Sequence, residues 1–226
     1  MDMTTHHARH PREAIGANYS LDAMRAAQAQ TWRVLEAIAA AITPGMRESE
    51  AMALGEDILA HHGMELDWHP LVIRFGPNTL KIFSEKNDGD LVLGEDDIFF
   101  IDMGPVFLGH EGDAGATFVT GHDAEMAACA KAAKTLFERV RKIWHDGDVG
   151  GIALYEAAAH EAEKLGWELN LEIKGHRVSD YPHRALPPGG QLGTLDDVPG
   201  AGLWVLEIQI RHPTRPFGAF YEDLLD

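Results

Sequence analysis

Apolar residues recur at helical spacing near the start of the chain. One apolar face is formed by Leu21, Met24, Ala27, Trp32, Leu35, Ile38 and Ile42. This period of about 3.6 residues predicts an amphipathic helix that begins after Ser20 and ends at Pro44–Gly45. The same kind of pattern predicts a second helix over residues 48–63 and two alanine-rich helices over about 122–145 and 151–165.

Apolar and β-branched segments, broken by turn residues, follow each pair of helices and predict strands. The first group comprises residues 67–78, 96–104, 105–112 and 113–121, and the second comprises 167–173, 202–212 and 217–225. A stretch rich in Pro and Gly, residues 183–202, predicts a long surface loop. Because the strands are grouped, we expect an α+β fold with an antiparallel or mixed sheet, helices on one face and a duplicated half.

The length of 226 residues suits one globular core. Residues 1–18 are polar and irregular, so we expect a flexible N-terminal tail there and a catalytic domain over 19–226. No apolar run approaches the roughly 18 residues that a membrane span needs, and the N-terminus lacks the core of a secretory signal. We therefore expect a cytoplasmic protein without a membrane partner.

The chain is strongly acidic, with 36 Asp and Glu against 19 Lys and Arg and a formal net charge of −17. Contacts to nucleic-acid phosphates need clustered basic side chains, so the composition argues against a nucleic-acid partner. The single cysteine, Cys129, has no partner for an internal disulfide.

Acidic residues interrupt the most apolar predicted strands. Asp102 follows IFFI, Glu207 lies between LWVL and IQI, and Glu222 lies in AFYEDLL. A buried carboxylate needs a cationic partner, and the nearest basic residue on these strands is Arg211. One arginine is too little for three acids, which favours divalent cations as the missing positive charge.

A further aspartate, Asp113, and two histidines fit such a site. Asp102 and Asp113 lie on adjacent segments of a predicted hairpin and can reach one ion from the same side. His176 follows a strand and a glycine, and we expect it to complete a mixed nitrogen and oxygen site. His183, seven positions later, can face the open coordination side. We expect His110 and Glu111 to lie on a solvent-exposed turn.

The ordered set of Asp102, Asp113, His176, Glu207 and Glu222, with the motifs GDAGATF and GHRVSDYPH, resembles a known superfamily. It is that of methionine aminopeptidases, proline aminopeptidases, prolidases and creatinases, here in a short single-domain form. The resemblance covers about residues 20–226. It implies the pita-bread fold, a curved and mostly antiparallel sheet with helices on its outer face and pseudo-duplicated halves.

The resemblance also implies a two-metal centre. Asp102 would hold one ion, His176 and Glu207 would hold the other, and Asp113 and Glu222 would bridge both. The cofactors would be two divalent ions, with manganese, cobalt, zinc and iron all compatible with these ligands. Glu207 would in addition act as the general base and then as the acid.

Histidines are the expected substrate-binding and catalytic groups beside the metals. By the resemblance, His183 donates to the developing oxyanion or to the substrate carbonyl. Many relatives carry another histidine before the first metal-binding strand, where this chain has Ile82 or Phe83. His69 is our candidate for a replacement, with a structural role as the alternative.

Other substrate contacts are expected near His69. Trp68 precedes it and is predicted to line the pocket. Arg177 and Arg74 are candidates to bind a substrate carboxylate, with surface ion pairing as the alternative. Proline-specific relatives tend to have an arginine where this chain has Phe220, and at most twenty residues precede the first helix, which disfavours a long prolidase.

Three functions follow from these observations. The first is an aminopeptidase, Xaa-Pro-specific or related, or a dipeptidase that acts on short peptides through a hydroxide shared by two ions. The second is a metal-dependent hydrolase or lyase of a small non-peptide substrate on the same fold. The third is a non-catalytic binding homologue, which the retained acids argue against. A homodimer is compatible with all three.

Overall fold

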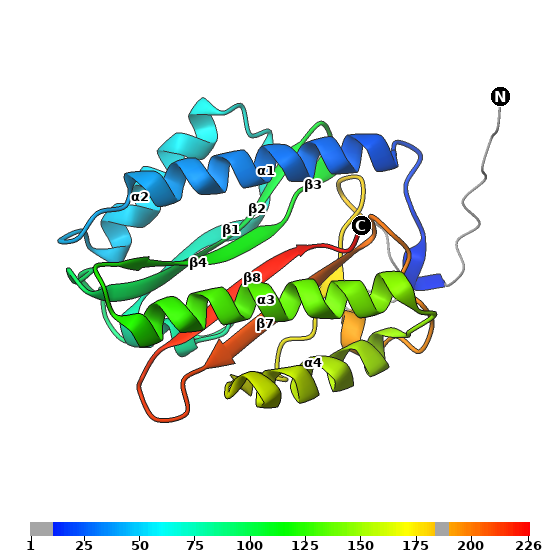
Figure 1. Ribbon diagram of the computed structural model, residues 1–226. Helices are drawn as coiled ribbons and strands as arrows, with labels where there is room; N and C mark the ends of the chain where they lie inside the picture. Colours follow the sequence, from blue (N-terminus) through cyan, green and yellow to red (C-terminus); the bar gives the residue numbers. More distant parts are fainter. Residues whose placement is uncertain (1–10, 184–189) are drawn as a thin grey trace.

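The helices and strands follow one another in the order that the sequence predicts (Figure 1). The computed structural model describes residues 11–183 and 190–226. The helices are α1 (Leu21–Ala41), α2 (Glu48–His61), α3 (Ala124–Asp146) and α4 (Gly151–Leu165), with short 3₁₀ turns η1 (Pro11–Glu13), η2 (Gly76–Leu80) and η3 (Leu192–Thr194). The strands are β1 (Leu66–Phe75), β2 (Asp97–Phe107), β3 (His110–Glu111), β4 (Ala114–Thr120), β5 (Glu168–Leu169), β6 (His176–Arg177), β7 (Trp204–Arg211) and β8 (Gly218–Leu224).

The strands form one antiparallel sheet in the order β1-β2-β4-β8-β7-β5, with β3 paired to β2 and β6 paired to β7. The first half of the chain supplies α1, α2, β1, β2 and β4, and the second half supplies α3, α4, β5, β6, β7 and β8. The β4–β8 pairing joins the halves at the middle of the sheet. The predicted α+β pita-bread fold, with its curved sheet and repeated halves, is confirmed.

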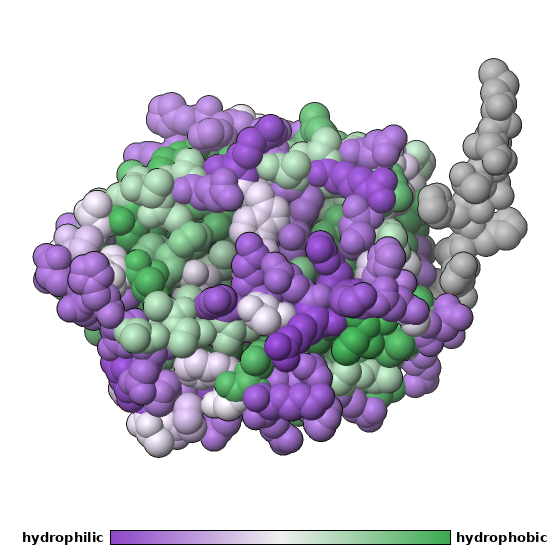
Figure 2. All heavy atoms as spheres, in the orientation of Figure 1, coloured by the Kyte–Doolittle hydropathy of each residue, from purple (hydrophilic) through white to green (hydrophobic). Residues whose placement is uncertain are grey.

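Two apolar clusters attach the helices to the sheet. Residues of α1 and α2, such as Leu35 and Leu59, pack on Ile101 of β2, whereas α3 and α4 pack on Leu206 and Ile208 of β7. Alternate strand residues point to opposite faces, so the residues between these core positions lie on the face away from the helices. The helical side is mostly hydrophilic outside, with hydrophobic residues gathered between α1 and α3 (Figure 2).

Two strand predictions differ from the structure. The segments 96–104 and 105–112 contribute to a single long strand, β2, which passes through Pro105. The ladder of β1 shifts register between Asp67 and His69, opposite Pro105, and such a bulge is where a sheet tolerates proline. The segment 167–173 forms only the two-residue strand β5.

Residues 11–18, which fall within the predicted N-terminal tail over 1–18, contact the domain. Glu13 is buried, and its carboxylate accepts hydrogen bonds from Trp204 Nε1 and Gly200 N, each at 2.7 Å. The backbone N–H of Gly16 donates to Asp180 Oδ1. Residues 11–18 therefore pack on the domain because buried polar partners fix them, while residues 1–10 lie outside the described ranges.

None of the helices in the described part of the chain is both long and apolar enough to cross a membrane.

Candidate metal centre

The strand register brings three acids into one row across the sheet. Asp102 of β2 is paired with Gly115 of β4, Gly115 with Glu222 of β8, and Glu222 with Glu207 of β7. The core residues that alternate with them, such as Ile101, face the helices, so the acids share the opposite face. The two halves of the chain thus contribute carboxylates to the same site.

Gly115 keeps space open in the middle of this row. A Cβ at Gly115 would lie 2.9 Å from Glu222 Oε1 and 2.5 Å from Phe220 Cε1. Both distances are shorter than real contacts of a Cβ allow. The glycine therefore lets the Glu222 carboxylate occupy the place between the strands.

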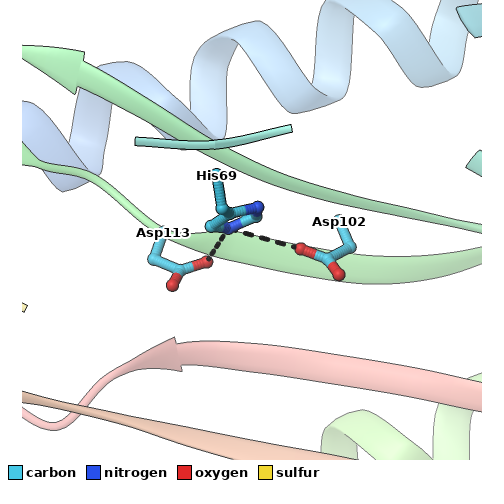
Figure 3. A group of neighbouring side chains, drawn as sticks. All are labelled: His69, Asp102 and Asp113. Atoms are coloured by element: carbon cyan, nitrogen blue, oxygen red, sulfur yellow. Dashed lines mark hydrogen bonds and ion pairs between the residues drawn. The ribbon is translucent and has the colours of Figure 1, made fainter. Parts of the chain in front are cut away.

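A fourth acid and two histidines complete the cluster. Asp113 directly precedes β4 and is fully buried. His69 Nε2 lies 3.3 Å from Asp113 Oδ1 and 3.6 Å from Asp102 Oδ1 (Figure 3), and His176 Nε2 lies 3.0 Å from Asp113 Oδ2. Gly104 faces His69 in the register, and a Cβ there would lie 2.1 Å from His69 Cδ2, so the glycine admits the imidazole ring.

These side chains form two groups of donor atoms, each within 4.8 Å of one another. One group comprises His69, Asp102 and Asp113, and the other comprises Asp113, His176 and Glu222. Asp113 belongs to both groups. Glu207 belongs to neither, and its Oε2 accepts a hydrogen bond of 2.7 Å from Gly175 N.

The acids of the row are held in an environment that disfavours their negative charge. Burial raises the pKa of Asp102, Glu207 and Glu222, and nearby carboxylates raise it further. Glu222 Oε1 is buried without a hydrogen-bond partner. A cation would satisfy this oxygen and offset the repulsion, so the residues present fit divalent metal ions.

The histidines supply positive charge to the same cluster. Burial lowers the pKa of His69, but Asp113 and Asp102 outweigh it and raise the value to about 9. Burial likewise lowers the pKa of His176, and Asp113 raises it to about 10. Burial alone would raise the pKa of Asp113, yet the two imidazoles bring it well below its usual range. In the metal-free protein, the two imidazoles thus supply the positive charge that the buried Asp113 carboxylate needs.

A pocket of about 230 Å³ opens onto the acids. Its lining residues are Trp68, His69, Phe83, Asp102, His176, Glu207 and Glu222. The ring centroid of Trp68 lies 4.6 Å from that of His69 and 5.4 Å from that of His176, and both ring pairs meet edge to face. Phe83, which is 54% exposed, lies 5.8 Å from the His69 ring. The structure thus places Trp68 in the pocket wall and Phe83 at its mouth.

Glu111 and His110 correct the prediction of a solvated turn. Both are buried, because β3 pairs with β2 and His110 forms a bridge to Asp180. Glu111 Oε2 lies 2.7 Å from His183 Nδ1, and Glu111 Oε1 accepts from His183 N. The spacing of two residues between Glu111 and Asp113 equals the strand period, and this signal in the sequence indicates that the two side chains share a face.

His183 lies near the pocket without entering either donor group. Its ring centroid is 6.3 Å from that of Trp68, and its Nδ1 contacts Glu111. The chain that follows, residues 184–189, lies outside the described ranges. His183 is thus oriented by a buried carboxylate beside the site.

Arg177, a candidate from the sequence to bind a substrate carboxylate, is engaged inside the domain. The side chain is buried, and its guanidinium donates to the backbone carbonyls of Arg12, Ala14 and Leu203. It also lies 5.5 Å from the ring centroid of Trp204. The planar donors hold the N-terminal segment against β7, which is a structural role.

Arg74 is also buried rather than exposed to a ligand. It donates from Nη1 to Ile82 O and from Nη2 to Glu85 O, each at 2.8 Å. These bonds fix the segment that carries Phe83. Arg74 therefore shapes the mouth of the pocket without lining it.

A sheet that brings carboxylates and imidazoles from both halves of one domain into a single cluster is typical of metal-dependent hydrolases. The chain belongs to the metallopeptidase family M24, whose model matches residues 22–223. A comparison with curated protein sequences gives no match.

Several solved structures share the fold. The chain is similar to the X-Pro aminopeptidase from Thermotoga maritima (TM-score 0.74, 19% identity, 91% of this chain and 60% of that one). It is similar to the prolidase from Pyrococcus furiosus (TM-score 0.74, 18% identity, 94% of this chain and 62% of that one). It is also similar to the methionine aminopeptidase from Thermotoga maritima (TM-score 0.70, 16% identity, 94% of this chain and 98% of that one). It spans about three fifths of the length of the first two.

Proposed function

We propose that this protein is a metal-dependent peptidase that cleaves short peptides, as an aminopeptidase, Xaa-Pro-specific or related, or as a dipeptidase. The observation that carries the proposal is the pair of donor groups that share Asp113 inside an M24 domain. The names of the similar structures support peptide substrates.

Two divalent ions fit this arrangement. Asp102 would hold one ion, His176 and Glu207 the other, and Asp113 and Glu222 would bridge both. His69 lies beside the first position, where its imidazole can contact either the ion or the substrate. Ions held here would act as Lewis acids on a scissile carbonyl and supply a nucleophile at neutral pH.

Glu207 would hold the proton of the reaction. Its carboxyl group lines the pocket, where it can exchange a proton with a bound substrate. Gly175 N fixes its Oε2. Glu207 would accept the proton of the attacking water and deliver it to the departing amine.

His183 would donate to the substrate carbonyl as negative charge develops on its oxygen. Glu111 Oε2 lies 2.7 Å from its Nδ1 and fixes the orientation of the ring, so Nε2 is the ring nitrogen left to face the substrate. The pocket walls would bind the residue next to the scissile bond. Trp68 and Phe83 are aromatic, and about 230 Å³ suits a single apolar side chain.

A second candidate is hydrolysis or lyase chemistry on a small non-peptide substrate. The observation that favours it is Phe83, an apolar ring at the mouth of a small pocket. By the resemblance, many relatives carry a histidine where this chain has Ile82 or Phe83. Such a substrate would carry a carbonyl and an apolar group.

The experiment is a substrate screen with the protein loaded with Mn²⁺, Co²⁺ or Zn²⁺. Dipeptides, Xaa-Pro peptides and longer peptides with apolar N-termini are assayed for amine release, with and without a chelator. We expect chelator-sensitive cleavage that Glu207→Gln abolishes. Metal-loaded protein that cleaves none of these peptides but converts a non-peptide amide or ester would favour the second candidate.

A further inference from the structure

Two buried side chains on helices grip the backbones of two candidate metal ligands. The Gln28 side chain of α1 bonds both the N–H and the C=O of Asp113. The Tyr155 hydroxyl of α4 donates to Glu207 O at 3.0 Å and accepts from Glu207 N at 3.2 Å. We refer to these two contacts as the backbone clamps.

Each clamp fills a gap in the sheet ladder. β3 ends at Glu111 and β4 begins at Ala114, so Asp113 lies outside both strands. A buried peptide group needs hydrogen-bond partners, and the Gln28 amide supplies a donor and an acceptor together. Without it, the ligand would sit on a backbone that the ladder does not hold.

The second gap is at the outer edge of β7. There, β6 pairs as far as Val205 and β5 begins pairing at Ile210. Glu207 lies between these points, and the hydroxyl of Tyr155 takes the place of a neighbouring strand. A hydroxyl can do so because it donates and accepts at once.

The clamps are part of a wider network around the acids. The Gln28 Nε2 also donates to Asp223 Oδ1 at 2.7 Å, and Asp223 follows Glu222 in β8. The Tyr155 ring is confined, because a Cβ at Gly193 would lie 2.9 Å from its Cδ2. Gln28 therefore restrains both Asp113 and the neighbour of Glu222 in β8, and the Tyr155 ring is itself held in place.

Rigid backbones matter here because the donor set must persist before any cation arrives. The strand register places Asp102, Glu222 and Glu207 in one row, and like charges held side by side repel one another. Restraining Asp113 and Glu207 from the helical side lowers the reorganisation needed when ions bind.

We propose that Gln28 and Tyr155 are positioning residues that preorganise the metal centre by clamping the backbones of Asp113 and Glu207. The inference rests on the proposed metal centre and is independent of the substrate. Outer-shell partners of metal ligands typically contribute about 10- to 100-fold to metal affinity.

The test compares matched variants by calorimetric titration of Mn²⁺ into the metal-free protein. Gln28→Met and Tyr155→Phe remove the clamps while keeping side-chain size. Gln30→Met, on the same helix, and Tyr19→Phe, whose hydroxyl donates to Gly202 O, remove comparable hydrogen bonds elsewhere. Circular dichroism checks the fold of each variant. Tyr155→Phe removes only one oxygen from a confined ring, so it is the variant that should fold most like the wild type.

We expect the Mn²⁺ dissociation constant to rise about tenfold or more in both clamp variants and to stay within about twofold in both controls. The visible absorption of bound Co²⁺ should change in the clamp variants alone. Clamp variants that bind Mn²⁺ as tightly as the controls would overturn the inference, even if peptides are cleaved. Tight metal binding with no peptide cleavage would instead overturn the proposed function alone.

Discussion

Replacing Gly115 with alanine tests the geometry of the acid row directly. The new Cβ would lie 2.5 Å from Phe220 Cε1 and 2.9 Å from Glu222 Oε1. Phe220 is buried and its ring packs against Phe100, with centroids 5.3 Å apart, so it has little room to withdraw. The Glu222 carboxylate must therefore move as well.

The size of the effect follows from these contacts. Overpacking a buried site costs about 1–3 kcal/mol of unfolding free energy. At this chain length each kcal/mol lowers Tm by about 2–4 °C, so we expect Tm to fall by roughly 2–12 °C. Because Glu222 would bridge the ions, Gly115→Ala should also weaken Mn²⁺ binding by about tenfold or more.

The assay pairs differential scanning calorimetry with Mn²⁺ titration. Gly94→Ala is the matched control, since a Cβ at Gly94 meets its nearest neighbour, Asp97 Oδ2, at an ordinary 3.4 Å. A Gly115→Ala protein with wild-type Tm and wild-type Mn²⁺ affinity would show that the row does not hold the ions as proposed.

Three further perturbations address the pocket, the histidines and the buried acid beside the site. Phe83→Ala should lower kcat/KM for peptides with an apolar residue by about three- to tenfold, measured by amine release, and leave the Mn²⁺ affinity unchanged. An unchanged kcat/KM for these peptides would show that Phe83 does not contact the substrate. The metal-free protein should lose stability as pH rises from about 6.5 to about 10, because the raised pKa values of His69 and His176 stabilise the fold below 6.5 and this contribution disappears through pH 9 and 10. Denaturant titrations across this range check the slope, and a rise in stability would contradict it. Glu111→Gln should reduce kcat about 10²-fold through His183 while Mn²⁺ affinity stays constant, and retained turnover would refute that role.

Periodicity alone was enough to predict the main helices. The apolar spacing after Ser20 corresponds to α1, and the Ser20 side chain caps its first turn by accepting from Ala23 N. The acids on apolar strands were also informative, because a carboxylate at a core position needs a hydrogen-bond partner or a cation. Asp102 and Glu222 are indeed brought into one row by the register.

Contacts between distant segments were not accessible in the same way. Arg177 reads as a ligand-binding cation in the sequence, yet it bonds the carbonyls of a segment more than 160 positions away. Glu111 reads as a turn residue because its partner, His183, lies far along the chain. Short strands such as β5 depend on what pairs with them, and a propensity pattern carries no information on that partner.

The β4–β8 seam has a consequence for folding that concerns the molecule as a whole. Asp113 and Glu222 sit on opposite sides of this seam, so ions shared between them would act as non-covalent cross-links between the two repeats. At an ion concentration about 100 times the dissociation constant, such linkage adds about 2.7 kcal/mol to stability. Metal supply would then control how firmly the two repeats are held together.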